Sequence, residues 1–246
     1  METLTFETKQ EMGEAAARQG GRLMRQAIED NGQANIILAT GASQFEMLAG
    51  LVQQDVDWSR VVMFHLDEYI GMPETHPASF RKYLKERFVD NVPSLKAVHF
   101  VEGDKRGAAD ECARISRIIA DHPIDVAMVG IGENGHLAFN DPPADFDCEE
   151  PFIVVKLDEA CRRQQFGEGW FASLDDVPAE AISMSIRHIM RSSNIICTVP
   201  DDRKAVAVRD ALECPVTNLC PASILRTHPS CRMFLDSTAA SLLSEE

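Results

Sequence analysis

One glycine-rich segment, residues 130–143, carries side chains suited to proton transfer. It reads GIGENGHLAFNDPP and follows an apolar run, Asp125–Val129, that is typical of a buried strand. Its glycines allow the backbone to turn sharply and to approach a ligand closely. His136 and Asp141 lie five residues apart, and an imidazole beside a carboxylate suits general acid–base chemistry. The segment is therefore predicted to be an active-site loop at the carboxyl end of a strand.

Two other interpretations of this segment are weaker. Gly130–Gly135 matches the GxGxxG pattern of dinucleotide-binding proteins, but that pattern should open a long helix. The prolines at 142 and 143 prevent such a helix, so a nicotinamide cofactor is not expected. His136 could also be a buried structural residue or a metal ligand, but the histidines at 65, 76 and 136 lack a zinc-binding spacing. No metal is expected.

A pair of acids, Asp67 and Glu68, follows the predicted strand Arg60–His65. Neighbouring residues at a strand end point in different directions, so one acid can face a pocket while the structure holds the other. An acid in this position is a candidate general base. A solvated loop pair is the competing interpretation.

A turn of small residues joins the predicted strand Asn35–Ala39 to a helix that begins near Ser43. Backbone N–H groups at such a turn favour a phosphate, although an ordinary serine-capped helix gives the same pattern. The turn lacks the GxxxxGK[ST] pattern, so nucleotide hydrolysis is not indicated. Lys204 is predicted in the first turn of a later helix, at the same sheet edge. The candidate phosphate contacts are Thr40, Gly41, Ala42, Ser43, Lys204 and, from a predicted loop, Arg162 or Arg163.

Apolar runs alternate with helical patterns along the chain, which indicates an α/β fold: a doubly wound, mostly parallel sheet with helices on both faces. The predicted strands are Asn35–Ala39, Arg60–His65, Ala97–Val101, Asp125–Gly130, Phe152–Lys156, Ala181–Ser185, Asn194–Val199 and Cys231–Leu235. The predicted helices are Lys9–Asn31, Ser43–Gln54, Pro77–Val89, Lys105–Asp121, Asp202–Leu212 and a last one near Ser237–Ser244. Two irregular regions are expected, near Asn134–Pro151 and Arg163–Pro178. One domain is expected over residues 1–246.

Composition narrows the class of protein. The chain has 246 residues, 45% of them hydrophobic, and a formal net charge of −15, which argues against nucleic-acid binding. Its seven cysteines show no CxxC spacing and no signal peptide precedes them, so free thiols in the cytoplasm are expected. No apolar run is long enough to span a membrane. A homo-oligomer is possible.

Taken together, these motifs resemble the glucosamine-6-phosphate deaminase (isomerase) family, which includes 6-phosphogluconolactonase. The resemblance runs across nearly the whole chain. It rests on the Thr40–Ser43 turn, the Leu66–Tyr69 and His76–Phe80 segments, the Gly130–Pro143 loop, Lys204 and the late segment Pro221–Leu225.

The resemblance implies conversion of glucosamine 6-phosphate and water to fructose 6-phosphate and ammonia, with no metal or organic cofactor. His136 would open the sugar ring, Asp141 would orient and charge-balance that imidazole, and Asp67 would move a proton from C2 to C1. Asn134 stands where the family often has aspartate; it can orient a histidine by hydrogen bonding. Arg163 is a candidate phosphate ligand, and a galactosamine epimer is a possible substrate.

Two other functions are compatible with the same scaffold. A lactone hydrolase would use His136 to activate water and would not need a base at C2. Lactonases of the family usually continue the loop with Thr-Ala-Ser after the histidine, whereas this chain has Leu137-Ala-Phe139. A sugar-phosphate sensor would bind without turnover and would carry a DNA-binding segment, for which the chain has no room before its first strands.

Overall fold

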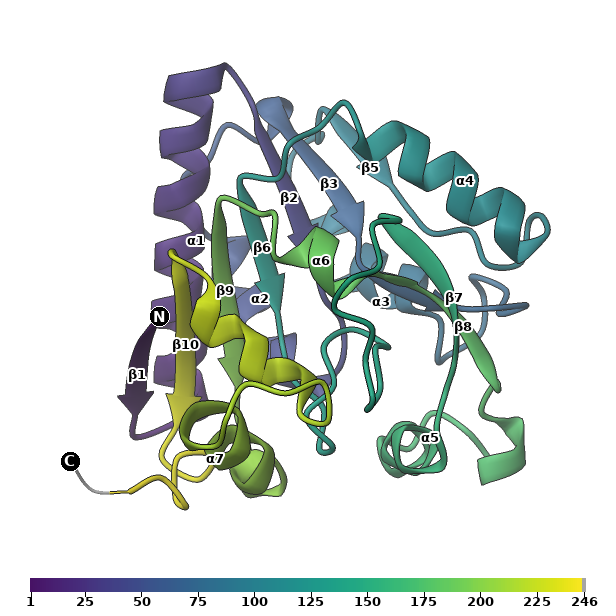
Figure 1. The fold of residues 1–246 in the computed structure, drawn as a ribbon. Helices are drawn as coiled ribbons and strands as arrows, with labels where there is room; N and C mark the ends of the chain where they lie inside the picture. The colour runs from purple at the N-terminus through teal and green to yellow at the C-terminus, as the bar shows by residue number, and fades with distance from the viewer. Residues whose placement is uncertain (245–246) are drawn as a thin grey trace.

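A parallel sheet forms the centre of the molecule. The computed structural model describes residues 1–244, and Figure 1 shows their arrangement. Within that range the main sheet has seven strands in the order β1-β10-β9-β6-β2-β3-β5, and every pairing is parallel. The strands are β1 (Glu2–Phe6), β2 (Ala34–Leu38), β3 (Val61–His65), β5 (Ala97–His99), β6 (Val126–Val129), β9 (Asn194–Val199) and β10 (Cys231–Asp236). The predicted α/β class with a mostly parallel sheet is confirmed.

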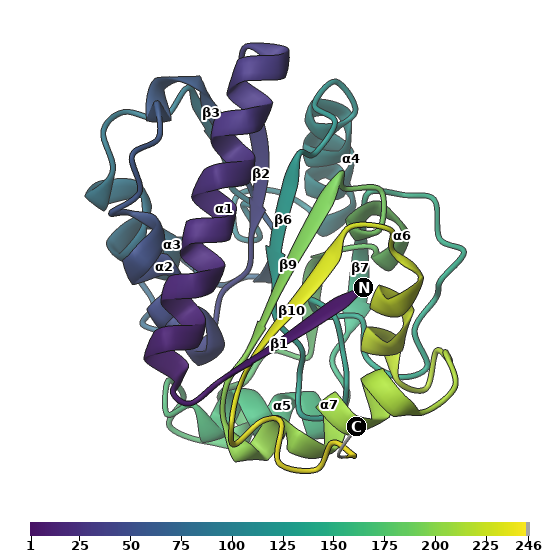
Figure 2. The same ribbon diagram turned by 90° about the vertical axis from the view of Figure 1, so that its left-hand side faces the viewer.

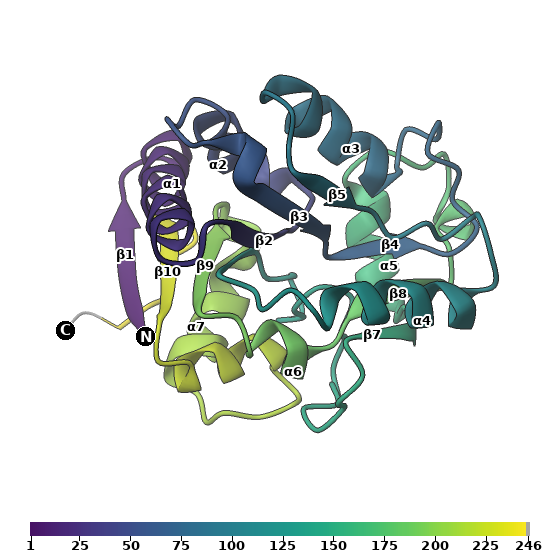
Figure 3. The same cartoon turned by 90° about the horizontal axis from the view of Figure 1, so that it is seen from above.

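Helices cover both faces of this sheet, as a doubly wound fold requires (Figures 2 and 3). Helices α1 (Lys9–Asn31), α2 (Phe45–Leu51) and α3 (Phe80–Arg87) pack on one face, and α4 (Ala108–Ile119), α6 (Ile186–Ile189) and α7 (Ala205–Glu213) lie on the other. Because strands in the middle of the sheet contact helices on both sides, β2, β3 and β6 are buried at every position.

Helix α1 has clear local start and stop signals. Thr8 and Glu11 form a reciprocal capping box at its beginning, and Gly32 ends it in the left-handed conformation at φ 78°. Gly13 lies where α1 crosses α2, and a Cβ atom there would overlap Glu46. Glycine at position 13 therefore allows α1 and α2 to pack closely together. This packing also holds the turn that precedes α2 close to the sheet.

A second, antiparallel sheet corrects the predicted placement of two strands. Phe152–Lys156 and the region of Ala181–Ser185 are strands, as expected, but they belong to a separate sheet with the order β4-β8-β7. It consists of β4 (Asp67–Tyr69), β8 (Glu180–Met184) and β7 (Phe152–Lys156). From Ile153 to Lys156, strand β7 alternates between half-buried and exposed residues, which is typical of a sheet covered on one face. Only Leu66 separates β3 from β4, so this sheet holds Asp67 at the edge of the first.

The structure differs from the sequence prediction in three further places. The sequence analysis predicted no strand at the position of β1. Helix α5 (Glu159–Gly167) occupies part of the expected irregular region 163–178; Asp158 caps it by accepting a hydrogen bond from the Cys161 N–H at 2.6 Å. Residues 237–244 form turns instead of the predicted helix. The Asp236 carboxylate accepts bonds from Ala239 N–H and from Asp201 N–H, which ties this segment to another loop. Within residues 1–244, none of the helices combines the length and apolarity needed to cross a bilayer.

Candidate active site

A cavity of about 430 Å³ opens at the carboxyl ends of β2, β3, β6 and β9. In a parallel sheet these ends meet at one edge, which is the usual ligand side of open α/β folds. The cavity walls are formed by the turn after β2, by β4 directly after β3, by the glycine-rich loop after β6, by the turn after β9 and by α5. Of the predicted site residues, the cavity lining includes Thr40, Gly41, Ala42, Ser43, Asp67, His136 and Lys204.

The two acids after β3 have different environments, as their alternation on a strand predicts. Asp67 lines the cavity. Glu68 is fully buried on the other side, where its carboxylate accepts hydrogen bonds from Tyr69 N–H at 3.0 Å, Ser79 Oγ at 2.9 Å and Arg81 N–H at 3.0 Å. Glu68 therefore fixes the start of α3 against β4, while Asp67 faces the ligand space.

The carboxyl group of Asp67 is set up to hold and release a proton near neutral pH. It is 5% exposed, and none of the hydrogen bonds found within residues 1–244 involves its side chain. Burial, followed by the charge of Glu68, raises the pKa of Asp67 to about 8. An acid with a pKa in this range can exchange a proton with a carbon acid, which is the task of a general base.

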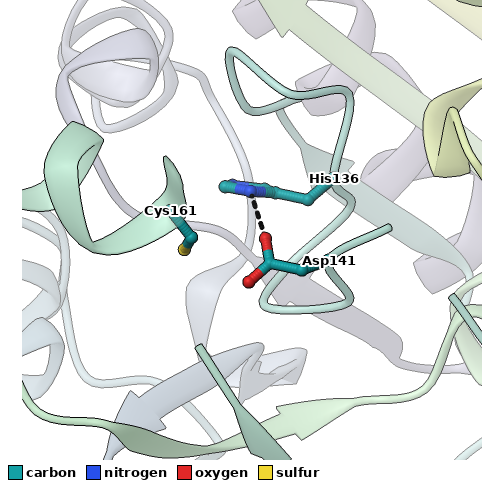
Figure 4. Close-up of side chains that lie close together, drawn as sticks. All are labelled: His136, Asp141 and Cys161. Carbon is teal, nitrogen blue, oxygen red and sulfur yellow. Dashed lines mark hydrogen bonds and ion pairs between the residues drawn. The ribbon is translucent and has the colours of Figure 1, made fainter. Parts of the chain in front are cut away.

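His136 and Asp141 form a hydrogen-bonded pair, and His136 lines the same cavity as Asp67. His136 Nδ1 lies 3.0 Å from Asp141 Oδ1 (Figure 4). Burial would raise the pKa of Asp141, but hydrogen bonds from His136, from Asn134 and from the Asp158 N–H outweigh it and lower the pKa. Asp141 is thus an ionised acceptor, which favours a proton on His136 Nδ1 and fixes the orientation of the imidazole.

Asn134 supports this pair from outside the cavity. Its Nδ2 donates to Asp141 Oδ1 at 3.0 Å, and its Oδ1 accepts from the His136 N–H at 3.1 Å. Both ends of the amide are therefore used to hold the histidine and its carboxylate in register. The orienting role predicted for Asn134 would use these two contacts, and the charge of the pair lies on Asp141.

The glycine-rich loop is shaped so that the imidazole fits against it. The His136 ring lies directly over Gly132, where a Cβ atom would overlap three ring atoms. Ala138 adopts φ 50°, an unusual conformation for a residue with a side chain, and it also lines the cavity. Asn140 anchors the loop by donating from Nδ2 to the carbonyls of Leu137 and Met184, both at 2.8 Å. The second sheet thereby holds the histidine in place.

The turn after β2 and the turn after β9 both line the cavity. Gly41 has φ 94°, which only glycine adopts readily, and Tyr83 Oη donates to its carbonyl at 2.8 Å. Lys204, 7% exposed, lies on the same cavity. Burial lowers the pKa of Lys204, while the charges of Glu133 and Glu168 oppose that change. An ammonium group with so little water around it gains strongly from an anionic ligand.

The structure does not bring Arg163 to this cavity. Its side chain is 65% exposed on α5 and forms an ion pair with Glu159, one helical turn away. Arg162 instead donates from Nη2 to the carbonyls of Leu174 and Val177, at 2.8 and 2.9 Å. Because α5 was not predicted, its exposed and buried faces could not be assigned from the sequence.

Sequence reasoning missed several charged residues of the cavity, among them Arg203 and Glu168. Arg203, next to Lys204, lines it and pairs with Asp201 at 3.1 Å. Its place in the same turn as Lys204 was a usable signal. Glu168 also lines the cavity; burial raises its pKa, which the charges of Lys204 and Arg203 partly offset. No spacing pattern links residues 168 and 204, so only the folded chain shows that they are neighbours.

Comparison with known proteins shows the family of this chain. A family model for glucosamine-6-phosphate isomerases/6-phosphogluconolactonase matches residues 7–233. A curated glucosamine-6-phosphate deaminase of Streptococcus pneumoniae is 35% identical, with 92% of this chain and 96% of that protein covered. Another, from Lacticaseibacillus paracasei, is 37% identical, with 91% and 92% covered. The chain therefore belongs to the glucosamine-6-phosphate isomerase/6-phosphogluconolactonase family.

Solved structures show the same fold. One described as a monomeric glucosamine-6-phosphate deaminase of the NagB superfamily superposes with a TM-score of 0.90 at 29% identity, covering 98% of this chain and 100% of that chain. A 6-phosphogluconolactonase from Trypanosoma brucei gives a TM-score of 0.81 at 17% identity, with 99% and 98% covered. The second likeness establishes the shared fold, which agrees with the resemblance found in the sequence.

Proposed function

We propose that this protein is a glucosamine-6-phosphate deaminase that releases ammonia and forms fructose 6-phosphate. One observation carries the proposal: Asp67, His136 and a candidate phosphate site line the same cavity. That phosphate site consists of the Thr40–Ser43 turn and Lys204. Asp67 would accept a proton from the carbon acid, His136 would protonate the sugar ring oxygen, and the turn with Lys204 would bind the phosphate. The curated relatives at 35% and 37% identity carry this activity in their names, which supports the same assignment here.

The phosphate fixes the register of the sugar in the proposed complex. The N–H groups of the Thr40–Ser43 turn and the ammonium of Lys204 would bind it. His136, with Nδ1 directed to Asp141, has Nε2 as its exchangeable position for the substrate. A proton delivered from His136 to the ring oxygen and one withdrawn from the C1 hydroxyl would open the pyranose to the aldehyde form.

Proton transfer between carbons is the role proposed for Asp67. Its ionised carboxylate would remove the C2 proton, so that the C2–H electron pair forms the C1=C2 bond while the C1=O π pair moves to O1. That oxygen takes back the proton withdrawn during ring opening, and an enolamine results. The same carboxyl group would return the proton at C1, leaving an iminium at C2. Water adds to that carbon and ammonia leaves, so the sum is glucosamine 6-phosphate plus water giving fructose 6-phosphate plus ammonia.

The lactonase alternative uses less of this site. Lactone hydrolysis requires a base for water but no acid at C2, so Asp67 would have no role in it. The family members described as lactonases that were compared are at most 18% identical to this chain, against 29% for the deaminase of known structure and 35% and 37% for the two curated deaminases. The raised pKa of Asp67 also suits proton shuttling better than simple charge stabilisation.

One assay separates these functions. Purified protein is incubated with glucosamine 6-phosphate, and ammonia and fructose 6-phosphate are measured in parallel; equal amounts of both are expected. Asp67→Asn should abolish their formation. Hydrolysis of 6-phosphogluconolactone without ammonia from any hexosamine phosphate would support the lactonase, and saturable binding without turnover would support a sensor. Including galactosamine 6-phosphate in the panel tests the epimer.

Three broader expectations belong to this proposal. The cores on the two faces of the main sheet share its strands, and one of them includes Phe152 and Met184 of the second sheet, which supports one domain over residues 1–246. All seven cysteines, each within residues 1–244, are free thiols, which supports a reducing cytoplasm. An amino-sugar phosphate is the proposed small-molecule partner.

A further inference from the structure

A cysteine that the proposed reaction does not use lies against the catalytic pair. Cys161, on the first turn of α5, is 1% exposed. His136 Nδ1 or Nε2, a carboxylate oxygen of Asp141 and Cys161 Sγ all lie within 4.8 Å of one another. Figure 4 shows the three side chains, which come from the glycine-rich loop and from α5. Nitrogen, oxygen and sulfur donors are thus gathered at one point.

The surroundings of this cluster are rich in negative charge. Asp141 is held ionised by its hydrogen bonds, and Asp158, which caps α5, accepts from the Cys161 N–H. Burial, followed by the charges of Asp141 and Asp158, raises the pKa of the Cys161 thiol well above its ordinary value. The thiol is therefore a poor nucleophile as it stands. A divalent cation would change this, because it stabilises the thiolate and neutralises the carboxylate together.

We propose that His136, Asp141 and Cys161 form an inhibitory binding site for Zn²⁺. These are three of the side-chain types that zinc prefers, and water would complete a tetrahedral set. The ion takes the place of the proton shared by His136 Nδ1 and Asp141. That proton and the thiol proton are released to solvent, and no electrons are exchanged.

The distances allow this with small movements. Zinc bonds of roughly 2.0–2.3 Å in a tetrahedron place the ligand atoms roughly 3.3–3.7 Å apart. His136 and Asp141 are at 3.0 Å and would separate slightly, while Cys161 closes in from within 4.8 Å. Mg²⁺ and Ca²⁺ are disfavoured, because they require more ligands, and oxygen ligands in particular.

Zinc at this point blocks acid–base chemistry by His136. An imidazole bound to a metal through Nδ1 can no longer form the imidazolium without losing the metal. The proton exchange proposed for ring opening needs that form. The site is therefore a means by which a soft metal ion switches the enzyme off without competing for the phosphate-binding turn.

The test uses Cys161→Ser, with Cys214→Ser as its matched control. Cys214 is the exposed thiol, next to Asp210, and would be the preferred place for adventitious zinc. Chelator-treated protein is titrated with Co²⁺, and the near-ultraviolet thiolate-to-cobalt absorption is recorded. Zinc inhibition of ammonia release is measured on the same samples, with Mg²⁺ as a further control.

The wild type and Cys214→Ser should show the cobalt–thiolate band and inhibition at micromolar zinc. Cys161→Ser should lose the band and need at least tenfold more zinc for half-inhibition, with unchanged basal activity. An undiminished band in Cys161→Ser, loss of the band in Cys214→Ser, or no cobalt band in the wild type would each overturn the proposal. The cobalt measurement needs no turnover, so it decides the metal site even if the proposed deaminase activity fails.

Discussion

Replacing Asp67 by asparagine is expected to remove a stability cost that grows with pH. The folded protein holds the pKa of this carboxyl at about 8, against 3.8 as its ordinary value, because of burial and the nearby charge of Glu68. Between these two values the folded state binds a proton that the unfolded state lacks. Stability therefore falls by about 1.4 kcal/mol for each pH unit in that window, or about 6 kcal/mol in all.

The asparagine variant has no such proton to lose. From pH 5 to pH 8 the wild type should lose about 4 kcal/mol more of its unfolding free energy than Asp67→Asn. Urea denaturation at pH 5, 6, 7 and 8, followed by tryptophan fluorescence or circular dichroism, measures the two curves. Subtracting them cancels the other buried acids. Glu68 reduces the difference somewhat, because neutralising its neighbour eases its own ionisation.

A control and a clear contrary result accompany this prediction. Asp121→Asn changes an exposed aspartate and should follow the wild-type curve. If Asp67→Asn ran parallel to the wild type at all four pH values, the carboxyl would be ionised in the free protein and the reasoning from burial would be wrong. The same ionisation predicts that kcat/KM rises about tenfold per pH unit up to a plateau near pH 8.

Three further substitutions test the other parts of the cavity. Lys204→Ala should raise KM for glucosamine 6-phosphate by roughly 10- to 100-fold, the worth of one charge-assisted hydrogen bond, whereas the exposed Lys156→Ala should not. Asp141→Asn should lower kcat by about 100-fold with a smaller effect on KM, since it removes the partner of the imidazolium and not a substrate contact. Gly132→Ala should fold but lose most activity, because its methyl group displaces the His136 ring. Steady-state kinetics measures all three variants, with circular dichroism as a check on folding. Wild-type turnover in Gly132→Ala would contradict the packing argument.

Short-range signals account for what the sequence predicted correctly. The long helix α1 follows from a capping box at Thr8, a regular apolar pattern and Gly32, all of which act within a few residues. The loop containing His136 and Asp141 was recognisable because its glycines, histidine and acid lie close together in the chain. The alternation of strands and helices fixed the edge of the sheet at which loop residues would meet.

Long-range pairing explains the errors. The sequence of residues 152–156 predicts a strand but does not show to which sheet the strand belongs. Its antiparallel pairing with β8 places it in the second sheet. Residues 237–244 contain helix-compatible residues, but the Asp236 carboxylate bonds to Asp201 N–H and favours turns. Arg163 was assigned to the phosphate because its segment read as a loop; in α5 it faces solvent beside Glu159.

The amino-acid sequence alone determined the chemistry of this protein's side chains and the sheet edge that carries them, because periodicity and turn-forming residues are local properties. Only the tertiary structure decided which of two adjacent acids faces the cavity, that Glu168 and Arg203 join Lys204 there, and that Cys161 lies close to His136 and Asp141. These outcomes depend on burial and on contacts between segments far apart in the chain, and neither is set until the two sheets pack together.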